Sequence, residues 1–152
     1  MTIGYTITDT TPEHIRLLGD SLRAGDRHEI TCMGLSPRKA LWRSYRHSIR
    51  RRTGIVDGQI AACWGLGGGF LDEVGQPWLM TSPAIEKIKI SFAREARAEV
   101  NSMLEIYPKL EGYVAASYSQ ACGFLRFLGF ELGNPIEIGA NRELFYMYRM
   151  ER

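Results

Sequence analysis

The sequence has few of the features that mark secreted, metal-binding or membrane proteins. Its 152 residues include only three cysteines, Cys32, Cys63 and Cys122. They are odd in number and far apart, so we expect neither a disulfide framework nor a metal site built on paired cysteines. We therefore predict buried free thiols, a reducing compartment and no metal ligands.

Long apolar runs and a strong charge of one sign are also missing. No apolar run approaches the roughly 18 residues that a membrane-spanning helix needs, and the N-terminus lacks the basic-then-apolar pattern of a signal peptide. The formal net charge is only +2, which demands no anionic partner. With no repeat and no low-complexity linker, we predict one cytoplasmic domain over residues 1–152, with no membrane contact.

The apolar periodicity that is present predicts a mixed α/β fold. We expect the order β-α-α-β-β-β-α-β-α-β-β, a mixed central sheet with helices on both faces. The expected strands cover 3–8, 54–58, 59–66, 78–82, 113–117, 130–138 and 144–150. The expected helices start near residues 12 and 37 and cover 83–106 and 120–128. Residues 23–35 are polar and punctuated by glycine, so we expect them to be irregular.

Local signals support several of these boundaries. Thr11-Pro12, Ser36-Pro37 and Ser82-Pro83 each pair an N-capping side chain with a proline in the first helical turn. Asp57-Gly58 is typical of a tight β-hairpin. The glycine-rich run at 65–69 has neither a Gly-Lys-Ser/Thr ending nor a following helix, so we interpret it as a loop rather than a phosphate-binding loop.

The most informative run covers residues 112–131. It predicts a buried strand, a break at 117–119, a short amphipathic helix and an exit at Gly129-Phe130. A helix that ends in Leu-Gly-Phe and enters a strand resembles the C-terminal half of the GNAT (GCN5-related N-acetyltransferase) fold. The element order extends this resemblance over nearly the whole chain. The resemblance implies an acyltransferase-like α/β fold, acetyl-CoA as cofactor and transfer to an amine.

Several shorter runs are similar to one branch of that superfamily, the internal virion (core) proteins of short-tailed T7-type bacteriophages. These runs lie at 22–30, 34–44, 56–66, 78–81, 92–94, 113–116 and 124–130. This narrower resemblance implies a role in virion assembly. The protein would then work in the host cytoplasm and in the virion, with other phage structural proteins, further copies of itself or packaged DNA as partners.

The GNAT resemblance also implies a pyrophosphate site between the fourth strand and the long helix, where the superfamily carries Arg/Gln-x-x-Gly-x-Gly/Ala. Here residues 80–87 contain no glycine, Pro83 removes an N–H donor, and Glu86 adds a negative charge. Thr81, Ser82 and Ala84 are the remaining candidate cofactor-binding residues. We therefore expect that no cofactor binds and that catalysis is weak or lost; an active protein would use acetyl-CoA.

The expected acid and base are also altered. Many GNAT enzymes place a proton-donating tyrosine where this chain has Leu125, so Tyr118 is our candidate acid, with Tyr113 and Tyr107 as substitutes. Asp26 and Glu29 are the candidate bases, because they are three residues apart on one helical turn and can face one cleft. The alternatives are His28 or His47 as base, or surface ion pairs of the two carboxylates with Arg43 or Arg46.

A cluster of arginines follows the second expected helix start. Arg43, Arg46 and Arg50 fall on one helical face, and Arg51 and Arg52 end that helix in our prediction. Cations at a helix C-terminus complement its dipole, so a solvated helix end explains them. A patch for DNA or an acidic protein is the alternative.

Three functions follow, in this order. The first is a phage virion or assembly protein on a GNAT scaffold with weak or lost transfer, which is a non-enzyme or nearly so. The second is an active N-acetyltransferase with an atypical pyrophosphate loop. The third is a nucleic-acid-binding accessory protein.

Overall fold

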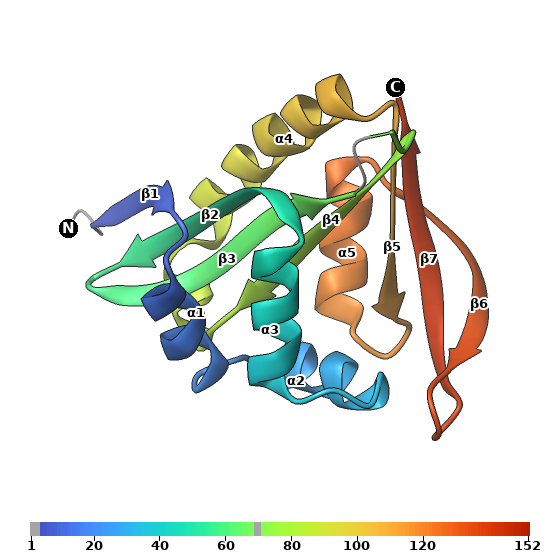
Figure 1. The fold of residues 1–152 in the computed structure, drawn as a ribbon, viewed down its shortest axis with the longest axis horizontal. Helices are drawn as coiled ribbons and strands as arrows, with labels where there is room; N and C mark the ends of the chain where they lie inside the picture. Colours follow the sequence, from blue (N-terminus) through green and yellow to red (C-terminus); the bar gives the residue numbers. More distant parts are fainter. Residues whose placement is uncertain (1–3, 69–70) are drawn as a thin grey trace.

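A computed structural model describes residues 4–68 and 71–152 of the chain, and shows a seven-stranded sheet with helices on both sides (Figure 1). Its strands are β1 (Tyr5–Asp9), β2 (Ser48–Val56), β3 (Gln59–Gly67), β4 (Val74–Thr81), β5 (Lys109–Ala115), β6 (Glu131–Ile138) and β7 (Glu143–Glu151). Its helices are α1 (Pro12–Gly19), α2 (Ala24–Cys32), α3 (Pro37–Arg46), the 3₁₀ helix η1 (Pro83–Ile88), α4 (Lys89–Ile106) and α5 (Ser119–Leu128). The strand order is β1-β2-β3-β4-β5-β7-β6.

The two faces of β3 explain the layers. Side chains alternate across a strand, and Cys63 packs with Leu18 and Leu41 of α1 and α3. Its neighbour Trp64 packs with Phe92 of α4 on the other side. The helices α1 to α3 thus cover one face and α4 and α5 the other, as the sequence predicted. Within the described residues, no helix is both long and apolar enough to cross a membrane.

The predicted local signals are confirmed at two helix starts and one hairpin turn. Thr11 and His14 form a reciprocal capping box at α1, and the Ser36 hydroxyl accepts the Lys39 N–H at α3. Asp57 and Gly58 both have positive φ, 50° and 77°, as a two-residue hairpin between β2 and β3 requires. Residue 3 of the first expected strand lies outside the described residues.

The prediction of an irregular segment at 23–35 is wrong, because most of it forms α2. The sequence hides this helix for two reasons. Its N-cap, Arg23, makes no capping hydrogen bond through its side chain, and one of its buried side chains is a carboxylate, Asp26. A helix that buries polar groups against a cleft does not show the usual apolar stripe.

The predicted boundary between α3 and β2 is also wrong. The helix ends at Arg46 and β2 begins at Ser48, so Arg50, Arg51 and Arg52 belong to a strand rather than a helix end. They pair with Leu66, Gly65 and Trp64 of β3. Pairing with this buried strand overrides the polar local sequence. Likewise, the long helix expected from residue 83 begins with the separate 3₁₀ turn η1.

Candidate active site

The sheet opens between β4 and β5. These parallel neighbours pair only at Val74 with Lys109 and at Gly75 with Leu110, although β4 continues to Thr81 and β5 to Ala115. The two strands therefore diverge, and a cavity of about 210 Å³ lies between them, α4 and α5. Its walls are mostly apolar, from Trp64, Leu79, Phe92, Val114 and Phe124 among others.

Helix α2 places one carboxylate on each of the diverging strands. Asp26 accepts hydrogen bonds from the Thr81 N–H at 2.7 Å and the Thr81 hydroxyl at 2.5 Å. Glu29 accepts the Ala115 N–H at 2.5 Å. Both carboxylates line the cavity. The partners of these candidate bases are thus the Thr81 and Ala115 N–H groups and the Thr81 hydroxyl, at the wide end of the opening, and not Arg43 or Arg46.

Burial makes both carboxylates hard to ionise. Desolvation, helped by the nearby Asp26 charge, raises the pKa of Glu29 to about 7, against the opposing hydrogen bond from Ala115. Desolvation also raises the pKa of Asp26, although the bonds from Thr81 and the charge of Arg23 oppose it. Glu29 is therefore suited to exchange a proton near neutral pH.

Tyr118 stands at the start of α5 and lines the same cavity. Its hydroxyl is buried and, within residues 4–68 and 71–152, makes no hydrogen bond of normal geometry, although it lies close enough to the Asp26 carboxylate to interact with it. Burial and the nearby Asp26 charge raise the pKa of Tyr118 to about 12. The hydroxyl thus keeps its proton and can donate a hydrogen bond to a ligand. Leu125 lines the cavity as well and supplies only apolar wall, while Tyr113 is half exposed at its edge.

Sequence reasoning missed Tyr148 of β7, which fills the narrow end of the opening. Its hydroxyl donates to the Pro77 carbonyl of β4 at 3.0 Å, so the ring reaches across β5. The ring passes over Gly112, where a Cβ would collide with the Tyr148 hydroxyl. A glycine inside a strand is a known sign of such a close approach, and Gly112 was the available signal.

The candidate pyrophosphate donors already have acceptors inside the protein. The Ser82 N–H donates to Ala61, the Thr81 N–H to Asp26, and the Ala84 N–H to the Ser82 hydroxyl. Pro83 has no N–H to offer. Glu86 lies beside them and pairs with Arg23 at 3.1 Å and Lys89 at 3.6 Å. A diphosphate would have to displace these bonds and the carboxylate.

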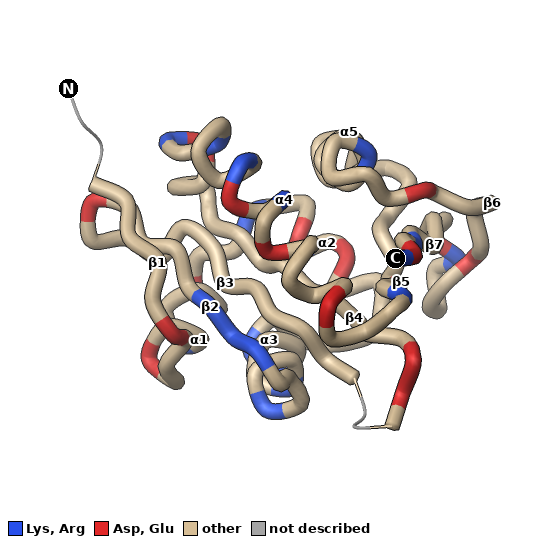
Figure 2. Tube along the Cα trace, turned by 90° about the horizontal axis from the view of Figure 1, so that it is seen from above, with Lys and Arg blue, Asp and Glu red and all other residues tan. Residues whose placement is uncertain are grey.

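The predicted helical arginine face does not form. Arg51 donates to the Tyr45 carbonyl at 3.0 Å and lies over the Tyr45 ring. Arg52 pairs with Asp9 at 2.9 Å. Arg50 lies 3.9 Å from Glu99. Figure 2 shows these cations along β2, beside those of α3. Strand alternation divides them between the two faces of the sheet.

Known proteins resemble this chain in their fold rather than in their sequence. No protein-family model matches the sequence, and no curated protein matches it. Among solved structures, a GNAT-family acetyltransferase from Bacillus anthracis aligns over 99% of this chain and 98% of its own, with a TM-score of 0.70 and 10% identity. A ribosomal-protein-alanine N-acetyltransferase from Brucella melitensis aligns over 97% of this chain and 99% of its own, with a TM-score of 0.71 and 12% identity. The RimL ribosomal L7/L12 α-N-protein acetyltransferase in complex with coenzyme A aligns over 97% of this chain and 93% of its own, with a TM-score of 0.70 and 8% identity.

These similarities bear on two of the sequence-based expectations. Because one similar structure is a coenzyme A complex, the expectation that no cofactor binds is not supported. The narrower resemblance to virion proteins stays a prediction. At such low identities the similarity establishes architecture only, and the chain has the mixed α/β fold of the GNAT acetyltransferases.

Proposed function

We propose that the protein binds an acyl thioester in the opening between β4 and β5 and transfers its acyl group to an amine. The observation that carries this proposal is the placement of Asp26 and Glu29, one on each diverging strand, at the wide end of an apolar cavity. A thioester chain suits the apolar walls, and a carboxylate at the end of the cavity suits an incoming amine.

The chemistry follows from the groups around the opening. The amine nitrogen bonds to the thioester carbonyl carbon, the C–S bond breaks, and a thiolate leaves. Glu29, ionised, takes the proton that the amine loses. The Tyr118 hydroxyl, which makes no hydrogen bond of normal geometry in the described chain, turns from the nearby Asp26 to donate a hydrogen bond to the leaving thiolate. Asp26 keeps the end of β4 in place through Thr81.

A backbone donor faces the same opening. The Thr81 N–H turns away from β3 toward Asp26, and successive N–H groups of a strand point to alternate sides. The Leu79 N–H therefore points into the opening, between the Pro77 carbonyl held by Tyr148 and the Thr81 N–H held by Asp26. A thioester oxygen in the cavity would accept from it as negative charge develops.

The chain offers fewer groups that could bind the nucleotide end of coenzyme A. The donors after β4 are engaged within the protein, and Glu86 stands beside them. We therefore expect this chain to hold the acyl-pantetheine part of a donor and to gain little from the diphosphate. Acetyl-CoA remains the first donor to test, with weak affinity.

The test is calorimetric titration of the folded protein with acetyl-CoA, coenzyme A and S-acetylpantetheine, which lacks the nucleotide. We expect heat from both thioesters and similar dissociation constants. Acetyl-CoA binding at least about a hundredfold more tightly than S-acetylpantetheine would contradict the closed diphosphate site. Absence of heat from all three ligands at millimolar concentration would contradict the proposed function itself.

A phage virion or assembly role with weak or lost transfer is the second candidate. The engaged donors at Thr81, Ser82 and Ala84 support it, as does Leu125 where a proton donor would be expected, together with the narrow sequence resemblance. Co-purification of the protein with particles or other core proteins would support this role. Absence of this protein from both particles and assembly intermediates would reject the virion role.

Nucleic-acid binding through Arg43, Arg46, Arg50, Arg51 and Arg52 stays a third prediction. The internal partners of Arg51 and Arg52 make it weaker. Binding to duplex DNA should fall steeply with salt and with loss of these cations. Binding insensitive to both would reject it.

A further inference from the structure

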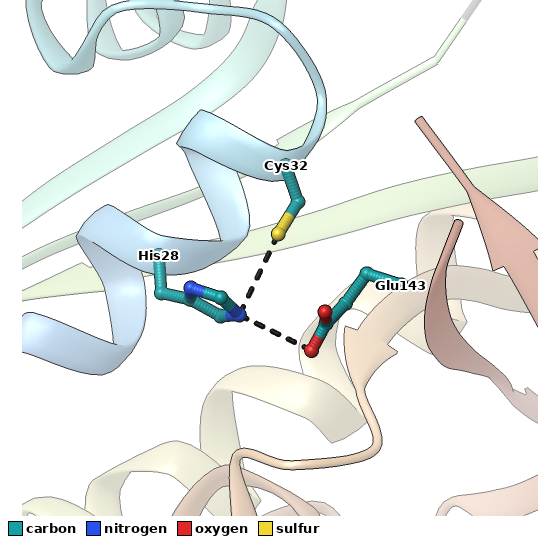
Figure 3. A group of neighbouring side chains, drawn as sticks. All are labelled: His28, Cys32 and Glu143. Carbon is teal, nitrogen blue, oxygen red and sulfur yellow. Dashed lines mark hydrogen bonds and ion pairs between the residues drawn. The ribbon is translucent and has the colours of Figure 1, made fainter. Parts of the chain in front are cut away.

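A histidine, a cysteine and a glutamate converge beside α2, and none of the three lines the cavity between β4 and β5. His28 and Cys32 stand four residues apart on α2, so they share one face of the helix, and Glu143 begins β7. The His28 Nε2 lies 3.5 Å from the Cys32 Sγ and 3.2 Å from the Glu143 Oε1 (Figure 3). All three ligand atoms lie within 4.8 Å of one another.

One imidazole nitrogen cannot satisfy both neighbours as an ordinary hydrogen-bonding group. If Nε2 carries a proton, it can donate fully to only one of the two atoms. If Nε2 is unprotonated, its lone pair faces the lone pairs of the Glu143 carboxylate. A cation placed among the three atoms would satisfy all of them at once.

Two of the three ligand separations fit a tetrahedral zinc ion, and the third, from the Cys32 Sγ to the Glu143 oxygen, lies within 4.8 Å and would close toward about 3.5 Å when the ion binds. Bonds of about 2.0–2.1 Å to nitrogen and oxygen and about 2.3 Å to sulfur give tetrahedral edges of about 3.3 Å (N to O) and about 3.5 Å (N to S). The observed separations are 3.2 and 3.5 Å. Imidazole, thiolate and carboxylate are all established zinc ligands.

The fold brings the two ligand-bearing segments together through backbone contact. Gly139, in the turn between β6 and β7, has φ of 80° and lies against the Cys32 carbonyl, where a Cβ would collide. This contact brings the start of β7 beside the last turn of α2. Ser117 donates to the same Glu143 oxygen at 3.3 Å, which orients the carboxylate from outside. Cys32 is buried while His28 is half exposed, so an ion can enter from the His28 side.

We propose that His28, Cys32 and Glu143 form a zinc site that ties α2 to the start of β7. The ion takes the imidazole Nε2, the thiolate Sγ and one carboxylate oxygen, and a water molecule completes the tetrahedron. The Cys32 thiol passes its proton to solvent when the metal binds. Because α2 also carries Asp26 and Glu29, the ion would hold these carboxylates across the opening between β4 and β5. The site does not depend on the proposed acyl transfer.

The test uses cobalt(II) as a spectroscopic substitute for zinc on the purified full chain, previously treated with a chelator. We expect one equivalent of Co²⁺ to produce a thiolate-to-metal charge-transfer band in the near ultraviolet, and one equivalent of Zn²⁺ to remove it. Cys32→Ser should abolish the band. Cys122→Ser is the matched control, because it removes another buried thiol and should leave the band intact.

The other two ligands are tested by affinity. Even loss of an outer partner typically weakens metal binding about 10–100-fold, so His28→Gln and Glu143→Gln should weaken Co²⁺ binding at least about tenfold. His47→Gln and Glu137→Gln are the matched controls and should not weaken it. Zinc at a hundredfold excess over its dissociation constant should raise the melting temperature of the unsubstituted chain by about 5–10 °C.

Two results would overturn the site. One is a folded protein, checked by circular dichroism, that gives no charge-transfer band with excess Co²⁺. The other is a band that survives Cys32→Ser. Either would leave the three side chains as a hydrogen-bonded cluster only.

Discussion

Two neighbouring regions at the wide end of the opening between β4 and β5 are built in opposite ways. At α2, the buried Asp26 and the partly buried Glu29 accept N–H groups from the two diverging strands. At η1, the Ser82 and Ala84 N–H groups already have acceptors, and Glu86 pairs with Arg23 and Lys89. The first region presents carboxylates to the cavity, while the second presents N–H groups that are engaged and a further negative charge.

This difference bears on two separate parts of the proposed function, the transfer of the acyl group and the binding of the donor's nucleotide. Under that proposal, the chain keeps carboxylates placed for transfer and offers little to the nucleotide. The similar folds establish the scaffold, but they do not say which of the two regions this chain uses. Substitutions in each region test the contrast.

The largest expected effect is on acyl transfer. Glu29→Gln keeps an acceptor for the Ala115 N–H and removes the base, so the rate of transfer should fall by about 10²–10⁴-fold. Thioester binding, measured by calorimetry, should change little. Glu105→Gln on α4 is the matched control. Unchanged turnover in the Glu29 variant would remove this residue from its proposed role.

The pH dependence of stability should reveal the same residue. The pKa of Glu29 is raised from 4.5 to about 7 on folding, so the unfolded chain loses this proton first as pH rises. The free energy of unfolding should therefore fall between pH 4.5 and 7 and stay lower above that window, by an amount on the order of 2–3 kcal/mol.

Urea unfolding with a chelator present measures this change, since the chelator keeps metal away from the neighbouring His28. The Glu29→Gln variant cannot titrate at this position, so its stability should fall less over the same range. Parallel pH profiles for the two proteins would mean that Glu29 ionises normally in the folded state.

A smaller effect is expected from the other carboxylate. Asp26→Ala leaves the buried Thr81 N–H without an acceptor and should lower the free energy of unfolding by about 1–3 kcal/mol. Asp26→Asn keeps an acceptor oxygen and should lose much less. Asp20→Ala, which removes an exposed carboxylate paired with Arg38, is the surface control. Equal losses for the alanine and asparagine variants would argue against the Thr81 hydrogen bond as the cause.

The smallest effect concerns the region at η1. Glu86→Gln releases Arg23 and Lys89 from their carboxylate partner and removes a negative charge near the start of α4. The loss of this repulsion should make the free energy of acetyl-CoA binding more favourable by about 0.3–1 kcal/mol, which tightens binding about two- to fivefold. S-acetylpantetheine, which has no phosphate, is the control ligand and should show no gain. An equal gain for both ligands would mean that Glu86 acts on the cavity rather than on phosphate.

The comparison between prediction and structure is clearest at α2. The spacing of Asp26 and Glu29 indicated one helical face, yet residues 23–35 were predicted to be irregular. Because the helix was missed, so was the i, i+4 relation between His28 and Cys32, and no metal site was expected. The side chains through which α2 contacts the two strands and β7 are mostly polar, and polar residues give no hydrophobic periodicity.

The arginine run at β2 shows a second limit. Arg50, Arg51 and Arg52 follow a helix in the sequence, and their local pattern does not distinguish a helix end from a strand. Pairing with β3 decides the matter, since that buried strand needs a partner along its whole length. A contact between distant residues cannot be seen in a three-residue window.

Local sequence was enough to predict the mixed α/β class, the helices on both faces, the capped starts of α1 and α3 and the hairpin at Asp57-Gly58. These features depend on local propensity and on periodicity. The divergence of β4 and β5, the crossing of Tyr148 over Gly112, and the contacts of α2 with both strands and the start of β7 appear only once the chain is folded. These depend on contacts between residues far apart in the chain, whose energies no local pattern encodes.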